Sequence, residues 1–205
     1  MTYFAFFLSF LLAPTLLTHQ FVYISTYMPK EDESIRKTII LDTEKSHIEI
    51  HGKTNINSFK CEYKMETMPN QFDIETLKYP THLNIKNGTL KLKVTEFSCE
   101  NSQMTKDFRE LLEFKKHPFI YIDVNEISQT TSKNFIAETL IQLSGQQQKY
   151  NMELATNPSQ EWVHCEGEQE ICITDFGLDA PEKFLGMVRV NENITIRFQL
   201  YLKIL

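Results

Sequence analysis

A single amphipathic helix constrains the fold of this 205-residue chain more than any other feature, because most of the remaining sequence has the pattern of β-strands. The helix is predicted between Asn101 and Pro118, where apolar residues recur at helical spacing. An isolated helix with an apolar face, in a chain of strands, must bury that face against a sheet or close one end of a barrel. The apolar stripe consists of Met104, Phe108, Leu111 and Leu112.

Both ends of this helix are marked in the sequence. Ser102 or Thr105 is expected to cap the first turn with its hydroxyl group. Lys115 and Lys116 suit the negative end of the helix dipole. Pro118 then prevents the helix from continuing, and the chain passes directly into a strand.

Alternation of apolar and polar residues predicts strands on both sides of the helix. Residues 46–51 alternate in this way, and residues 194–202 form the clearest strand of the chain. We expect Asn87-Gly88 to form a hairpin turn, because both residue types tolerate a positive φ angle. Residues 119–124 are apolar on both faces, which predicts a strand that is covered on both sides. Residues 68–79 are predicted to be irregular.

These patterns predict eight to ten strands, joined mostly by short turns, with one helix inserted. We therefore predict an all-β fold with one main α-helix: a closed antiparallel β-barrel of about eight strands, with the helical segment at one mouth. A barrel of this size can hold one small ligand.

The N-terminal residues predict export. Residues 3–17 are apolar, which is the length of a signal-peptide core and shorter than the roughly 20 residues that span a bilayer. We expect a leader over residues 1–25, a linker over 26–45, and one barrel domain over 46–205. The mature protein is then periplasmic or secreted, with no stable membrane span. An uncleaved anchor is the alternative.

Composition excludes some partners. The formal net charge is −6 and no basic stripe occurs, which argues against a nucleic-acid partner. The chain contains 15 Phe, 8 Tyr and 1 Trp. These aromatic residues fit either a densely packed core or an interior that holds an apolar ligand, and a homodimer also stays open.

Four cysteines in an exported chain suggest disulfide bonds. Cys61 and Cys99 each end an expected strand, and their thiols would meet if those strands pair. Cys165 and Cys172 flank a segment that we interpret as a hairpin tip, where a cross-hairpin bond is geometrically feasible. A zinc site is not expected, because no Cys-x-x-Cys spacing occurs.

No residue pattern predicts catalysis. His47, Glu49 and His51 share one strand face at a spacing that could suit a metal, but we interpret them as the solvated outer face of an alternating strand. The sequence has no nucleophile elbow, phosphate loop or dinucleotide glycine pattern. We therefore assign no catalytic residue, no metal site and no cofactor, and predict that the protein is not an enzyme.

Three segments carry a resemblance to a known family. The sequences TNINSFKC, MTKDFRELLEFKKHPFIYI and TDFGL, followed by the closing alternating strand, resemble the YceI-like family of bacterial exported proteins. The resemblance covers roughly residues 46–202. It implies a lipocalin-like antiparallel barrel with a helical segment near one mouth, which binds a polyisoprenoid lipid chain inside.

Two functions from different classes follow. The first is non-enzymatic binding or transport of a long apolar ligand, such as a polyisoprenoid, a quinone or another lipid, in the barrel interior. The second is a structural or protein-interaction module whose interior is filled with side chains. For the first function, the candidate ligand-binding residues come from motif positions and inward faces. They are Phe59, Phe108, Leu111, Leu112, Phe119, Tyr121, Phe176, Phe184 and Met187.

Overall fold

A computed structural model describes residues 34–180, 182–183 and 188–205. The chain divides into two units, Met1–Glu31 and Asp32–Leu205, and all described elements belong to the second. The expected leader and two candidate ligand-binding residues, Phe184 and Met187, lie outside the described residues. Within the described part, no helix is long and apolar enough to cross a membrane.

The described residues form fourteen strands, one α-helix and three short 3-10 helices. The first seven strands are β1 (Ile35–Leu41), β2 (His47–Lys53), β3 (Ser58–Tyr63), β4 (Gln71–Lys78), β5 (His82–Lys86), β6 (Thr89–Lys93) and β7 (Phe97–Cys99). The others are β8 (Phe119–Gln129), β9 (Asn134–Leu143), β10 (Gln146–Pro158), β11 (Val163–Cys172), β12 (Glu182–Lys183), β13 (Val188–Arg189) and β14 (Asn193–Ile204). The helices are α1 (Ser102–Leu111), η1 (Met65–Thr67), η2 (Val94–Glu96) and η3 (Ile173–Phe176).

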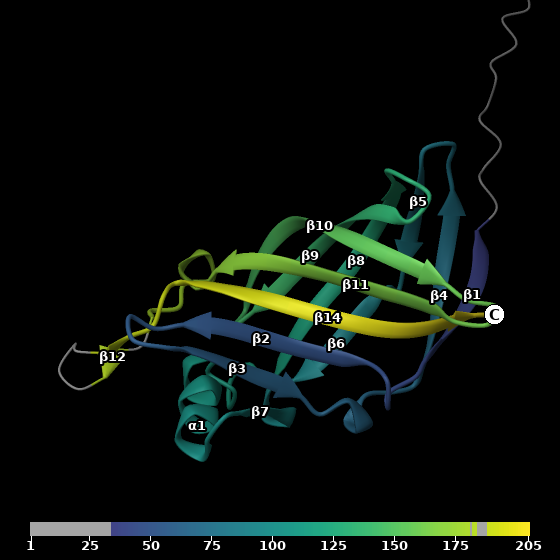
Figure 1. The fold of residues 1–205 in the computed structure, drawn as a ribbon. Helices are drawn as coiled ribbons and strands as arrows, with labels where there is room; N and C mark the ends of the chain where they lie inside the picture. Colours follow the sequence, from purple (N-terminus) through teal and green to yellow (C-terminus); the bar gives the residue numbers. More distant parts are fainter. Residues whose placement is uncertain (1–33, 181, 184–187) are drawn as a thin grey trace, which may run out of the picture. The chain divides into compact units, whose positions relative to one another are not determined.

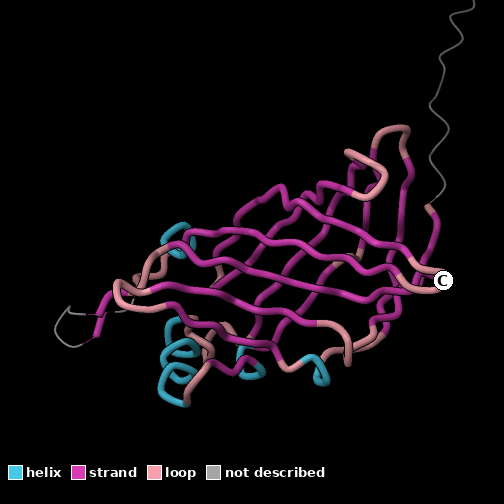
Figure 2. Tube along the Cα trace, in the orientation of Figure 1, coloured by secondary structure: helices cyan, strands magenta, loops and turns pink. Residues whose placement is uncertain are grey.

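Eight strands close into an antiparallel ring. Their order is β1-β4-β5-β8-β9-β10-β11-β14, and β14 pairs again with β1 (Figure 1). Figure 2 shows that strands make up most of the trace and that one longer helix lies beside them. The predicted fold class, an antiparallel ring of about eight strands with one α-helix, is confirmed.

Two strands of the ring each pair with two consecutive partners. β14 pairs with β1 toward its C-terminal end and with β2 along its first half. In the same way, β8 pairs with β5 toward its end and with β6 along its first half. In the half that contains β2 and β6, the sheet continues from β2 to β3 and β7. No strand pairing of the described residues joins β7 to β6.

The turn at Asn87-Gly88 has the expected positive φ angle, but it does not form a hairpin. Asn87 has a φ of 62°, as predicted. The prediction of a hairpin is wrong, because β5 and β6 both pair with β8 and not with each other. The amide of Val124 donates to the carbonyl of Gly88 at 3.0 Å, so the turn is a kink between two aligned strands.

Two segments that sequence analysis left outside the strands lie in the ring. Residues 68–79 were predicted to be irregular, but most of them form β4. Residues 26–45 were predicted to be a linker, but β1 occupies part of this range. The two segments pair with each other, and Ile39 lies opposite Phe72. Where the local alternation of a segment is weak, pairing with a distant segment therefore determines whether it forms a strand.

Helix α1 follows the predicted stripe, but its cap differs. The side chain of Asn101 accepts a hydrogen bond from the amide of Met104 at 2.8 Å, so Asn101 is the N-cap in place of Ser102 or Thr105. The helix ends at Leu111, and its C-cap residue, Leu112, is buried. The lysines that were expected in its last turn follow the helix. The remaining stripe residues are partly buried against the core.

The inward-facing side chains divide the ring into two halves. On β8, Ile120 and Ile122 are buried, whereas Val124 and Ile127 are only half-buried. Burial of the inward-facing side chains thus decreases from the start to the end of β8. On the antiparallel strand β9, it increases from the start to the end. We call the half beside α1 the closed end. We call the other half, where β1 begins and β14 ends, the open end.

Candidate functional site

Helix α1 covers the closed end, where β6 and β7 do not pair with each other. The guanidinium group of Arg109 donates hydrogen bonds to the backbone carbonyls of Thr95 and Phe97, just before and at the start of β7. The rings of Phe97 and Phe108 lie 5.4 Å apart. The hydroxyl of Ser144, in the turn after β9, donates to a helix-end carbonyl at 3.0 Å. The helix therefore joins β7 to the far side of the ring.

Five of the candidate ligand-binding residues lie at this closed end. Leu112 and Phe176 are 4% and 1% exposed and belong to the hydrophobic core. Phe59, Phe108 and Leu111 are partly buried and pack against the same core. The Phe59 ring also covers Gly52, leaving no room for a Cβ atom there. These residues thus form a packed floor beneath any space that a ligand could enter from the open end.

Phe119 and Tyr121 lie on the outer face of β8. Their neighbours Ile120 and Ile122 are the buried, inward-facing residues of this strand. The ammonium group of Lys91 lies 4.0 Å from the centre of the Phe119 ring and 5.7 Å from that of Tyr121. A strand that is apolar on both faces does not reveal from sequence which set points inward, and the motif led to the wrong face.

Toward the open end, inward-facing Leu41, Cys165 and Leu200 are buried, whereas a further set of inward-facing apolar side chains is half-buried although their strands are paired on both sides. Ile127 lies opposite Ala137, which is 1% exposed, and this fixes its inward direction. Leu154 lies opposite Phe135 in the same way. We call this set the open-end lining. It consists of Phe72, Ile74, Leu83, Ile85, Val124, Ile127, Phe135 and Leu154.

Sequence analysis missed the open-end lining because it followed the family motifs, which lie at the closed end. Simple alternation was present, since Leu83 and Ile85 are separated by one polar residue. The interior also holds polar groups, among them the buried residues Thr76 and Thr139. The hydroxyl of Tyr150 is buried with no hydrogen-bond partner among the described residues, and burial raises its pKa. A buried hydroxyl of this kind is suited to accept or donate a bond to a bound molecule.

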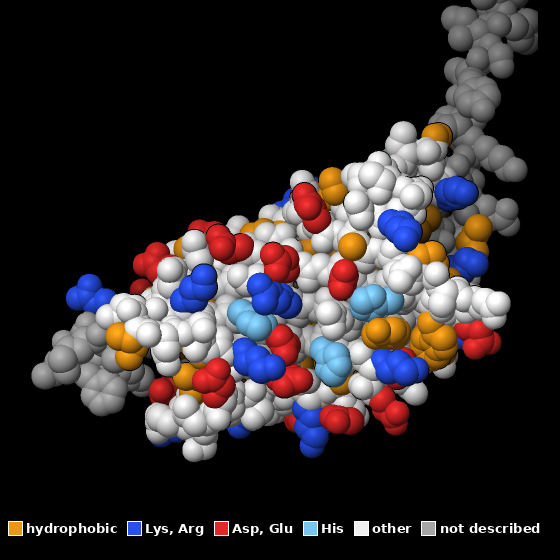
Figure 3. Space-filling view, in the orientation of Figure 1, with side chains coloured by type: hydrophobic (Ala, Val, Ile, Leu, Met, Phe, Trp, Pro, Cys, Tyr) orange, Lys and Arg blue, Asp and Glu red, His pale blue; other side chains and the backbone are white. Residues whose placement is uncertain are grey.

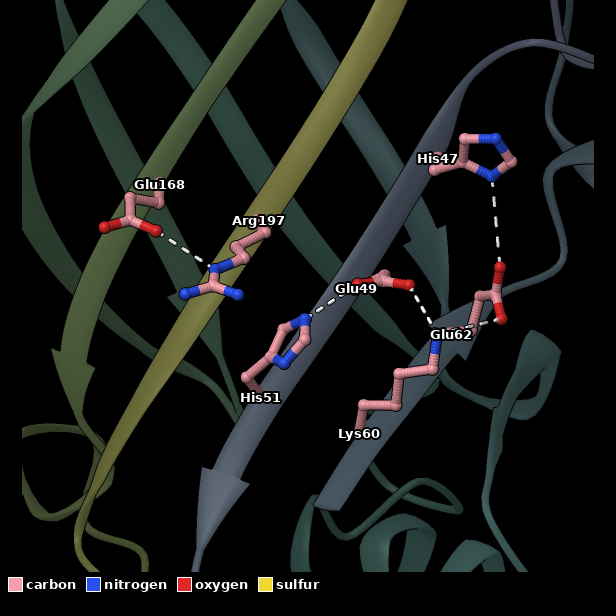
Figure 4. Close-up of polar contacts among 7 residues, drawn as sticks. All are labelled: His47, Glu49, His51, Lys60, Glu62, Glu168 and Arg197. Carbon is pink, nitrogen blue, oxygen red and sulfur yellow. Dashed lines mark hydrogen bonds and ion pairs between the residues drawn. The ribbon is translucent and has the colours of Figure 1, made fainter. Parts of the chain in front are cut away.

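The outer face over β14 and β2 is polar (Figure 3). Figure 4 shows that His51 and Lys60 both reach Glu49, with contacts of 2.7 and 2.8 Å. The hydrogen bond from Lys60 is the main cause that lowers the pKa of Glu49, opposed by partial burial. Arg197 and Glu168 form a further ion pair at 3.0 Å. The charged side chains on this face form ion pairs with one another, as expected for a solvated outer face.

This outer face is also hollowed. A groove of about 1160 Å³ crosses β10, β11, β14 and β2. Its lining is mixed: it includes the polar residues Glu153, Glu166 and Gln199, and also Phe135, Leu154 and Phe198. Among residues 34–180, 182–183 and 188–205, no group of three or more His, Cys, Asp or Glu side chains could hold a metal ion.

The four cysteines behave in two different ways. Cys61 and Cys99 form a disulfide bond that joins β3 to β7, with their Cα atoms 3.9 Å apart. Cys165 and Cys172 are both free. The predicted hairpin between them is wrong, because both lie on the single strand β11. Seven residues of extended chain separate them by roughly 23 Å, too far for a disulfide. Burial raises the pKa of the Cys165 thiol to about 11.

Comparison with known proteins places this fold. No curated protein matches the chain. The crystal structure of BcnA from Burkholderia cenocepacia superposes with a TM-score of 0.60 at 14% identity, covering 78% of this chain and 98% of that one. A polyisoprenoid-binding domain from Saccharophagus degradans, implicated in plant cell wall breakdown, gives a TM-score of 0.57 at 9% identity, covering 80% and 97%. At these identities, the similarity concerns the fold.

The family comparison agrees with the structure. The model of the YceI-like domain matches residues 39–202, which begin within β1 and end near the end of β14. The matched range therefore includes nearly all of the ring and the helix that covers one of its ends. Because the match extends over well more than half of its length, the chain belongs to the YceI-like family.

Proposed function

We propose that this protein binds a long apolar ligand inside the ring, without catalysing a reaction. One observation carries the proposal: the open-end lining is apolar and only half-buried, although it lies inside a closed wall of paired strands. Apolar side chains inside a domain are normally buried by one another. Incomplete burial within a closed wall favours an interior with room for a guest.

Burial of apolar area is sufficient to hold such a ligand. A chain of ten methylene groups would contribute about 8 kcal/mol at ~0.8 kcal/mol each, before the cost of association is subtracted. No directional chemistry is required. The ligand would rest on the closed-end floor of Phe59, Phe108, Leu111, Leu112 and Phe176, which we retain as candidate contacts. Phe184 and Met187 remain candidates from sequence alone.

A polyisoprenoid, or the isoprenoid tail of a quinone, is the ligand class that we favour. Membership of the YceI-like family supports this class. The name of the Saccharophagus degradans domain supports it as well, although only for that protein. We also propose that the protein acts in the periplasm or outside the cell. The disulfide between Cys61 and Cys99 fits an oxidising compartment.

The first test is identification of the bound ligand. Protein purified without detergent is extracted with organic solvent, and the extract is analysed by mass spectrometry. We expect a polyprenyl species that is absent from a mock purification. Absence of any lipid, together with no binding of a fluorescent polyprenyl probe to the delipidated protein, would contradict the proposal.

A matched pair of variants tests the location of the ligand. Leu154→Asp introduces a carboxylate into the open-end lining, whereas Ala155→Asp introduces it at the exposed neighbouring position. We expect Leu154→Asp to weaken probe binding at least about tenfold, because burying an unpaired charge is costly. Ala155→Asp should bind like the wild type. Thermal unfolding verifies that both variants fold, and Leu154→Trp gives a second, apolar way to reduce the space.

The alternative function is a structural or interaction module with a filled interior. The dense packing of the closed end favours this alternative, because buried residues such as Phe97 and Ile141 occupy that half completely. It predicts no extracted lipid and equal probe signals for Leu154→Asp and Ala155→Asp. Light scattering on the same samples measures whether the protein forms the homodimer that the sequence left open.

A further inference from the structure

We propose that the open end of the ring docks on an anionic lipid bilayer. This inference deepens the proposed function, on which its biological purpose rests, because a protein that carries a membrane lipid must receive it from a membrane. The docking surface is the rim, which we define as residues 34–38, 75–82, 129–134, 157–163 and 202–205. These segments are the ends and turns that strand pairing brings together around the open end.

The rim exposes large apolar side chains. Ile35, Ile204 and Leu205 are 51%, 57% and 60% exposed. Ile204 and Leu205 lie beside β1, because Thr38 exchanges two backbone hydrogen bonds with Leu205 and Ile39 lies opposite Ile204, and Ile35 is the first residue of the same strand. They are three of the four large hydrophobic residues that the described part of the chain exposes to this extent. Apolar side chains are thus concentrated at the mouth of the ring.

The rim is also basic, in contrast to the chain as a whole. Its segments contain five basic residues and two acidic residues, whereas the whole chain has a formal net charge of −6. Figure 3 shows hydrophobic side chains next to basic ones toward the end where the C-terminus lies. The basic residues are Arg36, Lys37, Lys78, Lys133 and Lys203, and the acidic residues are Glu75 and Glu161.

An anionic bilayer fits both properties of the rim. Apolar tips insert into the interfacial region, while lysine and arginine side chains contact anionic headgroups. An acidic protein partner would match the basic residues, but it would not explain isoleucine and leucine side chains at the mouth of an apolar interior. A ligand that leaves the bilayer beneath this mouth reaches the open-end lining without crossing water.

Vesicle binding of the full chain tests the docking, with variants that differ only on the ring. In Ile204→Asp/Leu205→Asp, the apolar rim is removed. In Lys78→Glu/Lys133→Glu, its charge is reversed. The control Ile56→Asp changes the fourth exposed hydrophobic residue, which is 70% exposed in the turn between β2 and β3. Lys106→Glu, on an exposed helix position, is the control for charge reversal.

Sedimentation with phosphatidylglycerol-phosphatidylcholine vesicles measures the bound fraction. We expect both rim variants to partition at least about tenfold less than the wild type, and both controls to stay within about twofold. Added salt should weaken wild-type binding, because it screens the rim charges. Equal binding of rim variants and controls, in samples that thermal unfolding shows to be folded, overturns the docking proposal.

A second measurement separates this inference from the proposed function. The fluorescent polyprenyl probe is delivered from cyclodextrin, without vesicles, to the wild type and to the rim variants. Normal probe binding by rim variants that fail on vesicles is the expected result. Probe binding by the wild type, without any difference between rim variants and controls on vesicles, overturns only the docking. Vesicle binding that depends on the rim, without probe binding, overturns only the proposed ligand.

Discussion

The two ends of the ring differ in how they are held, although the same long strands run through both. At the closed end, a disulfide, a helix and a bridging arginine hold the wall, and residues such as Phe97 are fully buried. At the open end, the lining is half-buried and Ile204 is exposed. The side chains inside one continuous sheet are therefore densely packed in one half, whereas the open-end lining in the other half is only partly buried.

The difference arises from how the long strands are paired. In the open half, β1, β4 and β5 complete the ring by backbone pairing alone. In the closed half, β2, β3 and β7 take their place and leave a gap beside β6, so side chains from α1 and η3 must fill it. Most of the core therefore lies at the closed end, and Leu41 and Leu200 extend it toward the open end. The following predictions test this contrast.

The largest effect is expected from the disulfide, because it holds the closed end. Replacing both Cys61 and Cys99 by alanine removes a cross-link between residues 38 positions apart. By loop entropy this costs about 4 kcal/mol of unfolding free energy. Urea unfolding of the double variant measures it. A loss that is no greater than for Cys172→Ala, at a free cysteine, would show that the closed end does not depend on the cross-link.

A pair of variants on one strand compares the two ends directly. Ile122→Ala should cost about 3 kcal/mol, because the side chain is 7% exposed and its removal leaves a cavity. Ile127→Ala, on the same face of β8 in the open half, should cost about 1 kcal/mol, because solvent or neighbours can relax around it. Urea unfolding of both variants gives the difference. Equal costs would contradict the division into two ends.

Removal of the arginine bridge should have an intermediate effect. Arg109→Met leaves the carbonyls of Thr95 and Phe97 without their charged donor, at an expected cost of about 2 kcal/mol. Lys106→Met, on the exposed side of the same helix, should change stability by less than about 0.5 kcal/mol. Hydrogen exchange of α1 amides is the second measurement. We expect faster exchange in α1 and little change at the open end.

The smallest effect concerns pH and the outer face of β2. The pKa of Glu49 is lowered in the folded protein, mainly by the hydrogen bond from Lys60. Its contribution is therefore present above the unfolded pKa of about 4.3 and is lost as pH falls through the lower folded pKa. Because the pair is partly exposed, we expect only about 0.5 kcal/mol. The stability difference between wild type and Glu49→Gln should be present at neutral pH and should shrink in acid. A difference that does not depend on pH would contradict this origin.

Much of the fold could be predicted because the information is local. The alternation over residues 194–202 lies within β14, and the stripe around Phe108 and Leu112 lies on the helix that covers the closed end. In each case, a few adjacent residues carry the whole signal.

The candidate site was harder to predict, because it depends on which side chains of each strand face the interior. Phe119 and Ile120 are both apolar, and only packing on the rest of the ring sends Ile120 inward. The motif positions drew attention to the closed end, where Phe176 is core, and away from Leu83 and Leu154 at the open end. Of the nine candidate ligand-binding residues, five therefore lie in the packed half and two on the outer face of β8, and Phe184 and Met187 lie outside the described residues.

The sequence by itself determined that this chain forms alternating strands and one amphipathic helix, because periods of 2 and 3.6 residues are local properties of the backbone. Only the tertiary structure decided that β5 and β6 share one partner, that Cys165 and Cys172 lie on one strand, and which end of the ring stays open. These outcomes depend on pairing between segments far apart in the chain, and no local pattern specifies that pairing.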